Sequence, residues 1–367
     1  MSIYWNEKTK RLAPYVPGEQ PKDRKFIKLN TNENPYPPSP LVIEAIKKAA
    51  SETLRLYPDP LCTELREAAA ARYGLKTGQV FASNSSDEIL AFAFAAFFEA
   101  RGNPIFFPDI TYSFYPVYAG LWEIPYEIKP LREDFSIECS AYQGKSGGIV
   151  LANPNAPTSI ALSIDELKMI VEAAEWNKRV MIVDEAYIAF ASTKGSCSTQ
   201  ATKSMLPLIG EFPNLLVTRS LSKDASLAGL RVGFAFGNEE LIEGLCRIRD
   251  SFNSYTLGSL ALAGATAAIK DASYYDQINS RVIATRSRVS QELEELGFRV
   301  LPSQANFLFA SPPAKNGHEF YLALRERGIL VRHFNKPRIE AFLRISIGTD
   351  DEMDVFLEAC REITNEK

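Results

Sequence analysis

The amino-acid sequence predicts an α/β fold with a mostly parallel sheet covered by helices on both faces. Short, continuously apolar runs alternate with helical patterns from about residue 41 to residue 262. Strands that are apolar throughout are typical of parallel sheets buried on both faces. Ser163 and Glu166 have the spacing of a capping box, which predicts a helix over residues 163–177. From about residue 263 a long helical pattern and short strands predict a separate, smaller α+β domain.

The expected elements follow in chain order. Residues 1–40 contain several prolines and little periodicity, so we expect an extended N-terminal arm that lies on the folded body. The large domain, residues 41–262, is expected to hold strands at 79–83, 104–109, 147–153, 179–185, 214–220 and 232–237. In the small domain, residues 263–367, the expected elements are a helix over 274–297 and the strand-like segments FRVLPS, NFLFAS, ILVRHF and FLRISIG.

The composition disfavours several classes of function. The net charge of −4 provides no basic surface for nucleic acid or for an anionic membrane. The two histidines lie in no cluster of metal-ligating residues, so we expect no metal site. The sequence contains neither GxGxxG nor GxxxxGK[ST], which are the usual signatures of dinucleotide and nucleoside triphosphate binding. A nicotinamide-dependent dehydrogenase is therefore disfavoured.

The sequence also predicts a cytoplasmic protein. Its five cysteines (Cys62, Cys139, Cys197, Cys246 and Cys360) are odd in number, scattered and without a CxxC pair, which favours a reducing compartment. The N-terminal residues MSIYWNEKTK contain no apolar segment of the kind found in signal peptides. The longest apolar run, residues 89–98, is about half as long as a membrane-spanning helix.

Polar side chains follow several predicted strands where each one ends. In open α/β sheets, ligands bind just beyond the carboxyl ends of the strands. The residues at these positions are Ser86 and Asp87, Tyr112, Asn153, Asp184 and Tyr187, and Ser220, Ser222 and Lys223. Taken singly, each is as well explained as a turn residue, a helix cap or a core aromatic. Their joint occurrence along one edge of a sheet favours a binding site.

This combination of side chains suits pyridoxal 5′-phosphate. The aldehyde of that cofactor forms a Schiff base with a lysine whose pKa is lowered by burial, a role that suits Lys223. Its ring nitrogen needs an ionised carboxylate, for which Asp184 is the candidate. Asn153 and Tyr187 can donate to its ring oxygen, and Tyr112 can stack on its ring. Its phosphate requires a helix N-terminus, hydroxyl groups and an arginine. These are the segment at Ser86 and Asp87, the hydroxyls of Ser220 and Ser222, and Arg231.

The ordered set of motifs resembles the histidinol-phosphate aminotransferase family of fold-type I pyridoxal-phosphate enzymes. The resemblance covers nearly the whole chain through LNTNENPYPPSP, YPDPLCTELREAAAARYG, NSSDEIL, FPDITYSFYPVYA, NPNAPT, VDEAY, SLSK, LAGLRVGFAFG, NFLFA and LRISIGT. Two residues depart from the family pattern, because Ser85 and Ser159 stand where the family usually has glycine. Ser85 lies at the phosphate turn and could alter its backbone, whereas Ser159 lies beyond the cofactor contacts.

The resemblance implies further roles for residues outside the sheet edge. It implies a homodimer in which Tyr57 reaches the cofactor phosphate of the neighbouring subunit. Arg344 would hold the α-carboxylate of glutamate or 2-oxoglutarate, and Arg332 would bind a substrate phosphate. Tyr15 resembles the aromatic residue of an arm that closes over the substrate.

The leading hypothesis is amino transfer between glutamate and imidazole acetol phosphate, with Lys223, Asp184 and Tyr187 as the catalytic residues. An aromatic 2-oxo acid or another phosphorylated amino alcohol or ketone could be the partner substrate instead. An enzyme similar to threonine-phosphate decarboxylase, which shares much of the same scaffold, is another alternative. An inactive binding protein of the same fold is a third class, but the intact set of Lys223, Asp184 and Arg231 speaks against it.

Overall fold

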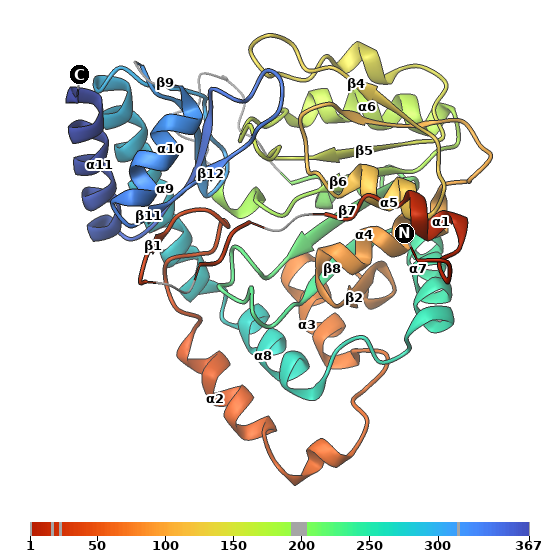
Figure 1. Cartoon of the computed structure of the whole chain (residues 1–367). Helices are drawn as coiled ribbons and strands as arrows, with labels where there is room; N and C mark the ends of the chain where they lie inside the picture. The colour runs from red at the N-terminus through yellow and green to blue at the C-terminus, as the bar shows by residue number, and fades with distance from the viewer. Residues whose placement is uncertain (1, 16–17, 22–23, 192–203, 314–315, 367) are drawn as a thin grey trace.

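The computed structural model describes residues 2–15, 18–21, 24–191, 204–313 and 316–366. A seven-stranded sheet lies at the centre of this part of the chain (Figure 1). Its strand order is β2-β8-β7-β6-β5-β3-β4. The strands are β2 (Val80–Ser83), β3 (Ile105–Pro108), β4 (Tyr126–Lys129), β5 (Gly148–Ala152), β6 (Met181–Asp184), β7 (Leu215–Ser220) and β8 (Gly233–Gly237). The six strands expected in this region are confirmed, and β4 was not predicted.

The sheet is mostly parallel, as expected. Strands β3 to β7 pair in parallel, whereas β8 runs antiparallel to both β2 and β7. β4 lies at one edge and its side chains are largely exposed. The sequence YEIK therefore has no continuous apolar run that could have identified it as a strand.

Helices cover both faces of the sheet, because successive residues of each strand point to opposite sides. On β5, Val150 packs in a cluster with residues of α4 (Ser85–Phe97), α5 (Tyr115–Leu121) and α7 (Glu239–Phe252). Its neighbours Ile149 and Leu151 belong to a second cluster with α3 (Thr63–Tyr73), α6 (Ile164–Trp176) and α8 (Ser259–Lys270). The expected capping box at the start of α6 is confirmed, since Ser163 and Glu166 bond to each other's main chain.

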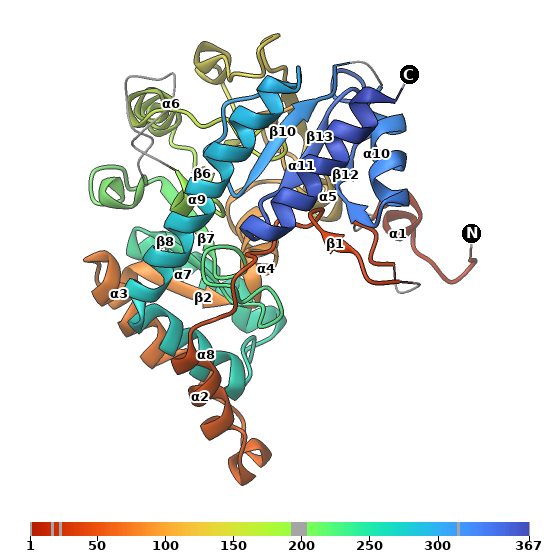
Figure 2. The ribbon, with the colours of Figure 1, turned by 90° about the vertical axis from the view of Figure 1, so that its left-hand side faces the viewer.

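A smaller layered unit follows α8 in the chain (Figure 2). Its antiparallel sheet has the order β12-β13-β10-β9. The elements are α9 (Ala272–Glu295), β9 (Arg299–Val300), β10 (Phe307–Ser311), α10 (Gly317–Glu326), β11 (Ile329–Leu330), β12 (Arg332–His333), β13 (Leu343–Ser346) and α11 (Asp350–Asn365). The predicted long helix and all four strand-like segments therefore form regular structure.

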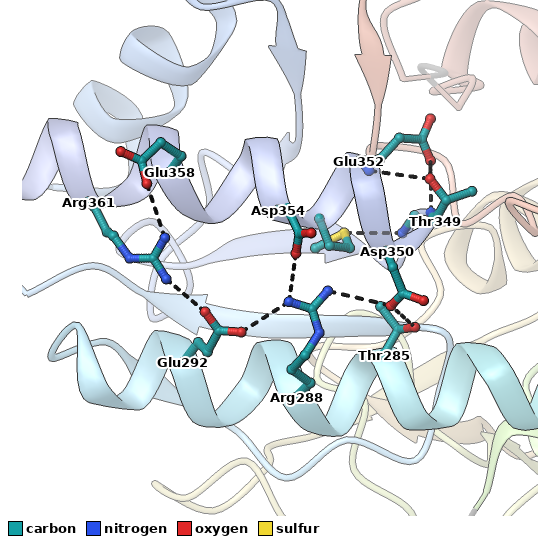
Figure 3. Close-up of polar contacts among 11 residues, drawn as sticks. Thr285, Arg288, Glu292, Thr349, Asp350, Glu352, Asp354, Glu358 and Arg361 are labelled. Atoms are coloured by element: carbon teal, nitrogen blue, oxygen red, sulfur yellow. Dashed lines mark hydrogen bonds and ion pairs between the residues drawn. The ribbon is translucent and has the colours of Figure 1, made fainter.

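Ion pairs join α9 to α11 across the outside of this unit (Figure 3). Arg288 on α9 contacts Asp354 on α11 at 2.7 Å, and Arg361 on α11 contacts Glu292 on α9 at 2.7 Å. Exposed pairs of this kind contribute about 0–1 kcal/mol each to stability. The packing therefore depends mainly on the apolar residues between the two helices, which belong to the large core cluster.

The N-terminal segment connects the two units. β1 (Ile27–Lys28) pairs in parallel with β11, and α1 (Glu7–Arg11) is tied to the end of α5 by an ion pair of 2.9 Å between Arg11 and Glu123. α2 (Pro40–Ala49) and the turn after it project away from the body in both views. The domain boundary expected at residue 262 stays a prediction, and α8, which spans it, packs against α2 and α3.

The apolar run and the cysteines, on which the predicted compartment depends, can be located in the structure. The apolar run 89–98 forms most of α4, and within the described ranges no helix is both long and apolar enough to cross a bilayer. Cys62, Cys139, Cys246 and Cys360 are free thiols, and Cys197 lies outside the described residues.

Candidate active site

A cavity of about 180 Å³ lies at the carboxyl edge of the large sheet, where the small unit and the N-terminal segment meet it. Of the residues predicted from the sequence, those that line it are Tyr15, Ser86, Asp87, Tyr112, Asp184, Tyr187, Ser220, Ser222, Lys223, Arg231, Arg332 and Arg344. A second cavity of about 380 Å³ shares Tyr15, Tyr112, Tyr187 and both small-unit arginines with the first. Most of the predicted side chains therefore line this cavity, and five of them also line the one beside it.

The lysine amine lies three residues beyond the end of β7. Its Nζ donates a hydrogen bond of 3.1 Å to the main-chain oxygen of Thr31 in the N-terminal segment. Burial, reinforced by the nearby charge of Arg344, lowers the pKa of Lys223 from 10.5 to about 8. About a tenth of the amine is therefore uncharged at pH 7, far more than for a solvated lysine, and the uncharged form is the one that attacks an aldehyde.

Asp184, the last residue of β6, is buried beneath the cavity. Its Oδ1 accepts hydrogen bonds from the Ala186 main chain at 3.2 Å and from the Thr218 hydroxyl at 3.3 Å. Its Oδ2 accepts one from the Tyr115 hydroxyl at 3.3 Å. Burial raises the pKa of this carboxyl from 3.8 to about 6. The group is a carboxylate at pH 7, and no cationic side chain is among its hydrogen-bond partners in the described chain.

The start of α4 forms a polar turn on the other side of the cavity. Arg231 donates to the Ser85 hydroxyl at 2.8 Å and to the Asp87 carboxylate at 2.5 Å. Asp87 also accepts a hydrogen bond of 2.6 Å from Tyr112. β8 approaches this turn closely, since a side chain at Gly233 would come within 2.5 Å of the Ser86 main-chain nitrogen. The turn is thus packed in place against the sheet.

Two serines at the end of β7 and just beyond it line the cavity together with this turn. The Ser220 hydroxyl accepts a hydrogen bond of 3.2 Å from the Ser222 main chain. The Ser222 Oγ is buried and has no partner in the described chain. A buried hydroxyl without a partner carries a free-energy cost, which a bound acceptor such as a phosphate oxygen would remove. This orphaned donor, the arginine and the helix start fit the phosphate of the expected cofactor.

Two predicted residues do not line the cavity. The Asn153 amide pairs with the main chain of Leu162, accepting from its nitrogen at 2.8 Å and donating to its oxygen at 3.4 Å. It therefore holds the loop after β5, and Ala156 lines the cavity instead. Tyr57 is 82% exposed and stacks on Tyr255 with ring centroids 4.7 Å apart.

Sequence reasoning identified Tyr15 of the N-terminal segment but missed the contributions of residues 30–32 and of α5. Asn30, Thr31 and Asn32 line the cavity, and Tyr115 reaches Asp184 from the start of α5. Asn32 donates a hydrogen bond of 3.0 Å to the Tyr187 hydroxyl. The motif LNTNENPYPPSP had marked the segment, but its polar residues carry no signal of which side chains they contact.

Comparisons of the amino-acid sequence with known proteins find aminotransferases over nearly the whole chain. The class I and II aminotransferase family model matches residues 24–360. The chain is 51% identical over 363 residues to a histidinol-phosphate aminotransferase of Clostridium acetobutylicum, with 99% of each chain covered. It is also 51% identical over 366 residues to histidinol-phosphate aminotransferase 1 of Bordetella parapertussis, again with 99% of each covered.

The fold is similar to that of a histidinol-phosphate aminotransferase from Sinorhizobium meliloti, whose crystal structure contains pyridoxal 5′-phosphate. The TM-score is 0.85 at 23% sequence identity, and the match covers 99% of this chain and 98% of the other. The expected fold class is therefore confirmed.

Proposed function

The chain belongs to the histidinol-phosphate aminotransferase family of the class I and II aminotransferases, and we propose that it transfers an amino group between L-glutamate and imidazole acetol phosphate in histidine biosynthesis. The observation that carries this function is the meeting of three groups in one cavity. These are the Lys223 amine of lowered pKa, the buried Asp184 carboxylate and the arginine pair of the small unit. Amino transfer requires these groups together, because an amine of lowered pKa forms the Schiff base, a carboxylate faces the ring nitrogen and cations hold the anionic substrates.

The cofactor of this reaction is pyridoxal 5′-phosphate, and the residues of the cavity fit it. When bound, it supplies an aldehyde that condenses with amines and a ring that withdraws electrons from the carbon attached to that nitrogen. Asp184 would keep the ring nitrogen protonated, and Tyr187 would donate to the ring oxygen. The hydroxyls of Ser220 and Ser222 and the guanidinium of Arg231 would bind the phosphate.

Ser86, Asp87 and Tyr112 would complete the cofactor site. Ser86, in the first turn of α4, can offer its main-chain nitrogen to the phosphate. Asp87 is an anion, so its contacts with Arg231 and Tyr112 point to a supporting role. It would hold the arginine and the tyrosine ring in place. Tyr112 would pack its ring against that of the cofactor.

Lys223 would carry the proton during the reaction. Its amine would lie next to the substrate carbon from which a proton must be removed. It would take the proton from the substrate Cα and return it to the cofactor carbon C4′. Burial supports this role, because it brings the pKa of Lys223 to about 8. That value is closer to neutral pH than the pKa of a solvated lysine.

The two arginines would distinguish the substrates. Arg344 would hold the α-carboxylate of glutamate, and Arg332 would bind the phosphate of the second substrate. Both line the first cavity and the larger one beside it. Tyr15, whose ring packs at a tilt against Phe114 with centroids 4.4 Å apart, would cover the bound substrate from the N-terminal segment.

The surface around α2 supports a homodimer. The apolar side chains exposed by more than half on α2 and the turn after it are Leu41, Leu54, Leu56, Tyr57 and Leu61. An exposed group of this size is typical of an interaction surface. In a dimer formed through this projection, Tyr57 could reach the cofactor phosphate of the partner subunit. The free thiols support a reducing compartment, and we propose the cytoplasm.

An amino-acceptor panel tests the substrate. The protein loaded with pyridoxal phosphate is given glutamate as donor, and imidazole acetol phosphate is compared with phenylpyruvate. We expect a kcat/KM about 10- to 100-fold higher for the phosphorylated acceptor, because one charge-assisted contact contributes about 1.5–3 kcal/mol and the arginine is otherwise left unpaired. Equal or better use of phenylpyruvate would overturn the assignment of the acceptor.

A further inference from the structure

Asn32 is buried in the N-terminal segment in an unusual backbone conformation. Its φ angle is 56°, which lies in the left-handed region, and its exposure is 1%. Asparagine occupies this region at lower cost than most residues. The main-chain nitrogen of Asn32 donates to the Ser346 hydroxyl at 2.8 Å, and its main-chain oxygen accepts from Asn306 at 3.0 Å. Both partners belong to the small unit, so the residue is fixed from that side.

The side chain of Asn32 points the other way, to Tyr187 on the large unit. Its Nδ2 lies 3.0 Å from the Tyr187 hydroxyl, and its Oδ1 accepts from the Ser346 hydroxyl at 2.9 Å. The opposite orientation of the amide would leave Ser346 with two donors aimed at its oxygen and no acceptor for its own proton. The hydrogen-bond network therefore selects the amide nitrogen as the group that faces Tyr187.

This orientation decides what the phenol can do. A phenol oxygen that accepts a hydrogen bond from an amide keeps its own proton for another acceptor. The Tyr187 ring is held edge-on against Phe307, with centroids 5.1 Å apart, and lines the cavity. Asn153 is not among the residues that line this cavity. Of the two residues assigned to the cofactor's ring oxygen, Tyr187 is thus the one that lines the cavity.

Asn32 belongs to a short segment that contacts three of the functional side chains. The Asn30 oxygen accepts a hydrogen bond of 2.9 Å from Arg344, and the Thr31 oxygen accepts the one from Lys223. Those two contacts use the main chain and do not depend on the side chain present. Only the third contact, from Asn32 to Tyr187, depends on residue type, so it can be tested by substitution.

We propose that Asn32 is a positioning residue that keeps the Tyr187 hydroxyl as a hydrogen-bond donor toward the ring oxygen of the cofactor. The inference rests on the proposed function, because it requires pyridoxal phosphate in this cavity. A hydrogen-bond donor stabilises the negative charge of the cofactor's ring oxygen. This stabilisation is largest when the nitrogen that joins Lys223 to the cofactor has lost its proton and no longer neutralises that charge. The Tyr187 donor therefore lowers the pKa of that nitrogen, and Asn32 maintains the donor.

The pH titration of the visible absorption band of the cofactor-loaded protein, without substrate, measures this effect. In Asn32→Asp the carboxylate still accepts from Ser346 but has no proton for Tyr187, so it turns the phenol proton away from the cavity. We expect the pKa of the nitrogen that joins Lys223 to the cofactor, read from this band, to rise by about 1–2 units. That rise is equivalent to the loss of one charge-assisted hydrogen bond. In Asn32→Gly, which suits the left-handed backbone and removes the amide, we expect a smaller rise.

The same two substitutions in a Tyr187→Phe background separate the proposal from a simple charge effect. The other charged groups that line the cavity are unchanged in every variant: Asp87, Asp184, Lys223, Arg231, Arg332 and Arg344. We expect Asn32→Gly to have no effect in this background, and Asn32→Asp to retain less than half of its shift.

Three outcomes would overturn the inference or its premise. Equal shifts of Asn32→Asp in both backgrounds would mean that its charge acts directly and that Tyr187 is not the intermediary. A wild-type titration in both Asn32 variants would mean that Asn32 has no influence on the phenol. If the wild type loaded with pyridoxal phosphate showed no such band at all, the proposed function itself would be wrong.

Discussion

Arg332 and Arg344 lie directly opposite each other on the antiparallel strands β12 and β13. Like charges that face each other across strands are destabilising, by up to about 1 kcal/mol. Arg344 donates to the Asn30 main chain and its Nε has no partner in the described chain. The Arg332 guanidinium lies 5.5 Å from the centre of the Phe334 ring. Neither arginine is paired with a described carboxylate, so a bound anion would relieve their repulsion.

The first prediction divides the roles of these two arginines. Arg344→Ala should impair chiefly the half-reaction with glutamate, because the carboxylate loses its partner. Arg332→Ala should impair chiefly the half-reaction with the phosphorylated substrate. Each loss should cost about 2–4 kcal/mol, or about one and a half to three decades in catalytic efficiency. Single-turnover absorbance measurements resolve the two stages.

The unliganded variants provide the control for this experiment. Because each substitution removes one of two facing charges, the thermal midpoint of the unliganded protein should stay equal or rise. A wild-type ratio of rates for phosphorylated and unphosphorylated acceptors in Arg332→Ala would show that Arg332 does not bind the phosphate.

The second prediction concerns the chemistry of Lys223. The rate at which the apoprotein captures pyridoxal phosphate should rise with pH through about 8, since only the uncharged amine attacks the aldehyde. Lys223→Ala should abolish turnover and still bind the cofactor noncovalently. Borohydride reduction of the loaded wild type, followed by peptide mapping, should place the label on Lys223. A label on any other lysine would contradict the assignment.

The lowered pKa of Lys223 also fixes how the stability of the apoprotein depends on pH. Between about pH 8 and pH 10.5 the unfolded chain binds more protons at this lysine than the folded one does. Its contribution to the free energy of unfolding therefore rises with pH in that window. Lys223→Met should unfold at a higher temperature than the wild type at pH 7, and the difference should shrink toward pH 10.

The third prediction concerns Asp184. Asp184→Asn should retain the cofactor but lose most activity, because the ring nitrogen loses the carboxylate that keeps it protonated. In the wild type the pKa of Asp184 is about 6 in the folded protein and 3.8 in the unfolded chain. The folded protein therefore binds more protons between these values, and the stability of the apoprotein falls as pH rises through them. The apoprotein of the variant should therefore be more stable than the wild type at pH 7. Near-native turnover would mean that another acid faces the ring nitrogen.

The large sheet could be predicted from sequence because its inner strands are apolar throughout. β5 and β6 are buried along their whole length, and runs of this kind identify a strand by composition alone. β4 escaped because it is a partly solvated edge strand. The polar turns at the carboxyl edge were identifiable because the chemistry of the cofactor requires particular side chains there.

The rest of the site depends on contacts between residues far apart in the sequence. Asn32 meets Tyr187 and Ser346, which lie 155 and 314 residues further along the chain. No local pattern encodes such contacts. Asn153 shows the converse, because its position after a strand suggested a ligand, whereas its amide is used within its own loop by Leu162. Local pattern thus predicted which strand ends matter, and tertiary packing decided which side chains face the cavity.

The fourth prediction is obligate dimerisation with a shared site. Tyr57 is too exposed in a single chain to be held there by burial. If it reaches the phosphate of the partner's cofactor, Tyr57→Phe should weaken cofactor affinity by about 1.5–3 kcal/mol, the loss of one hydrogen bond to a charged group. Sedimentation should show the variant still dimeric. A fully active wild-type monomer in the same measurement would rule the shared site out.

The last prediction concerns the two serines that stand where the family usually has glycine. Ser85 and Ser159 have φ angles of 70° and 65°, in the left-handed region that glycine occupies without strain. A side chain there costs about 1–2 kcal/mol. Ser159 is fully buried, and its hydroxyl donates to the Thr158 main-chain oxygen at 2.5 Å. Glycine and alanine both remove that hydroxyl, but only glycine also removes the strain.

Ser159→Gly should therefore be more stable than Ser159→Ala by about 1 kcal/mol, measured by chemical unfolding of the apoprotein. Equal stabilities would mean that the backbone at residue 159 relaxes without cost. At residue 85, Ser85→Gly should likewise be more stable than Ser85→Ala. These two substitutions should also affect cofactor binding. Both substitutions remove the hydroxyl that accepts from Arg231, so both should weaken cofactor binding to the same extent. Unchanged affinity in both variants would show that Arg231 is held at the phosphate turn by Asp87 alone.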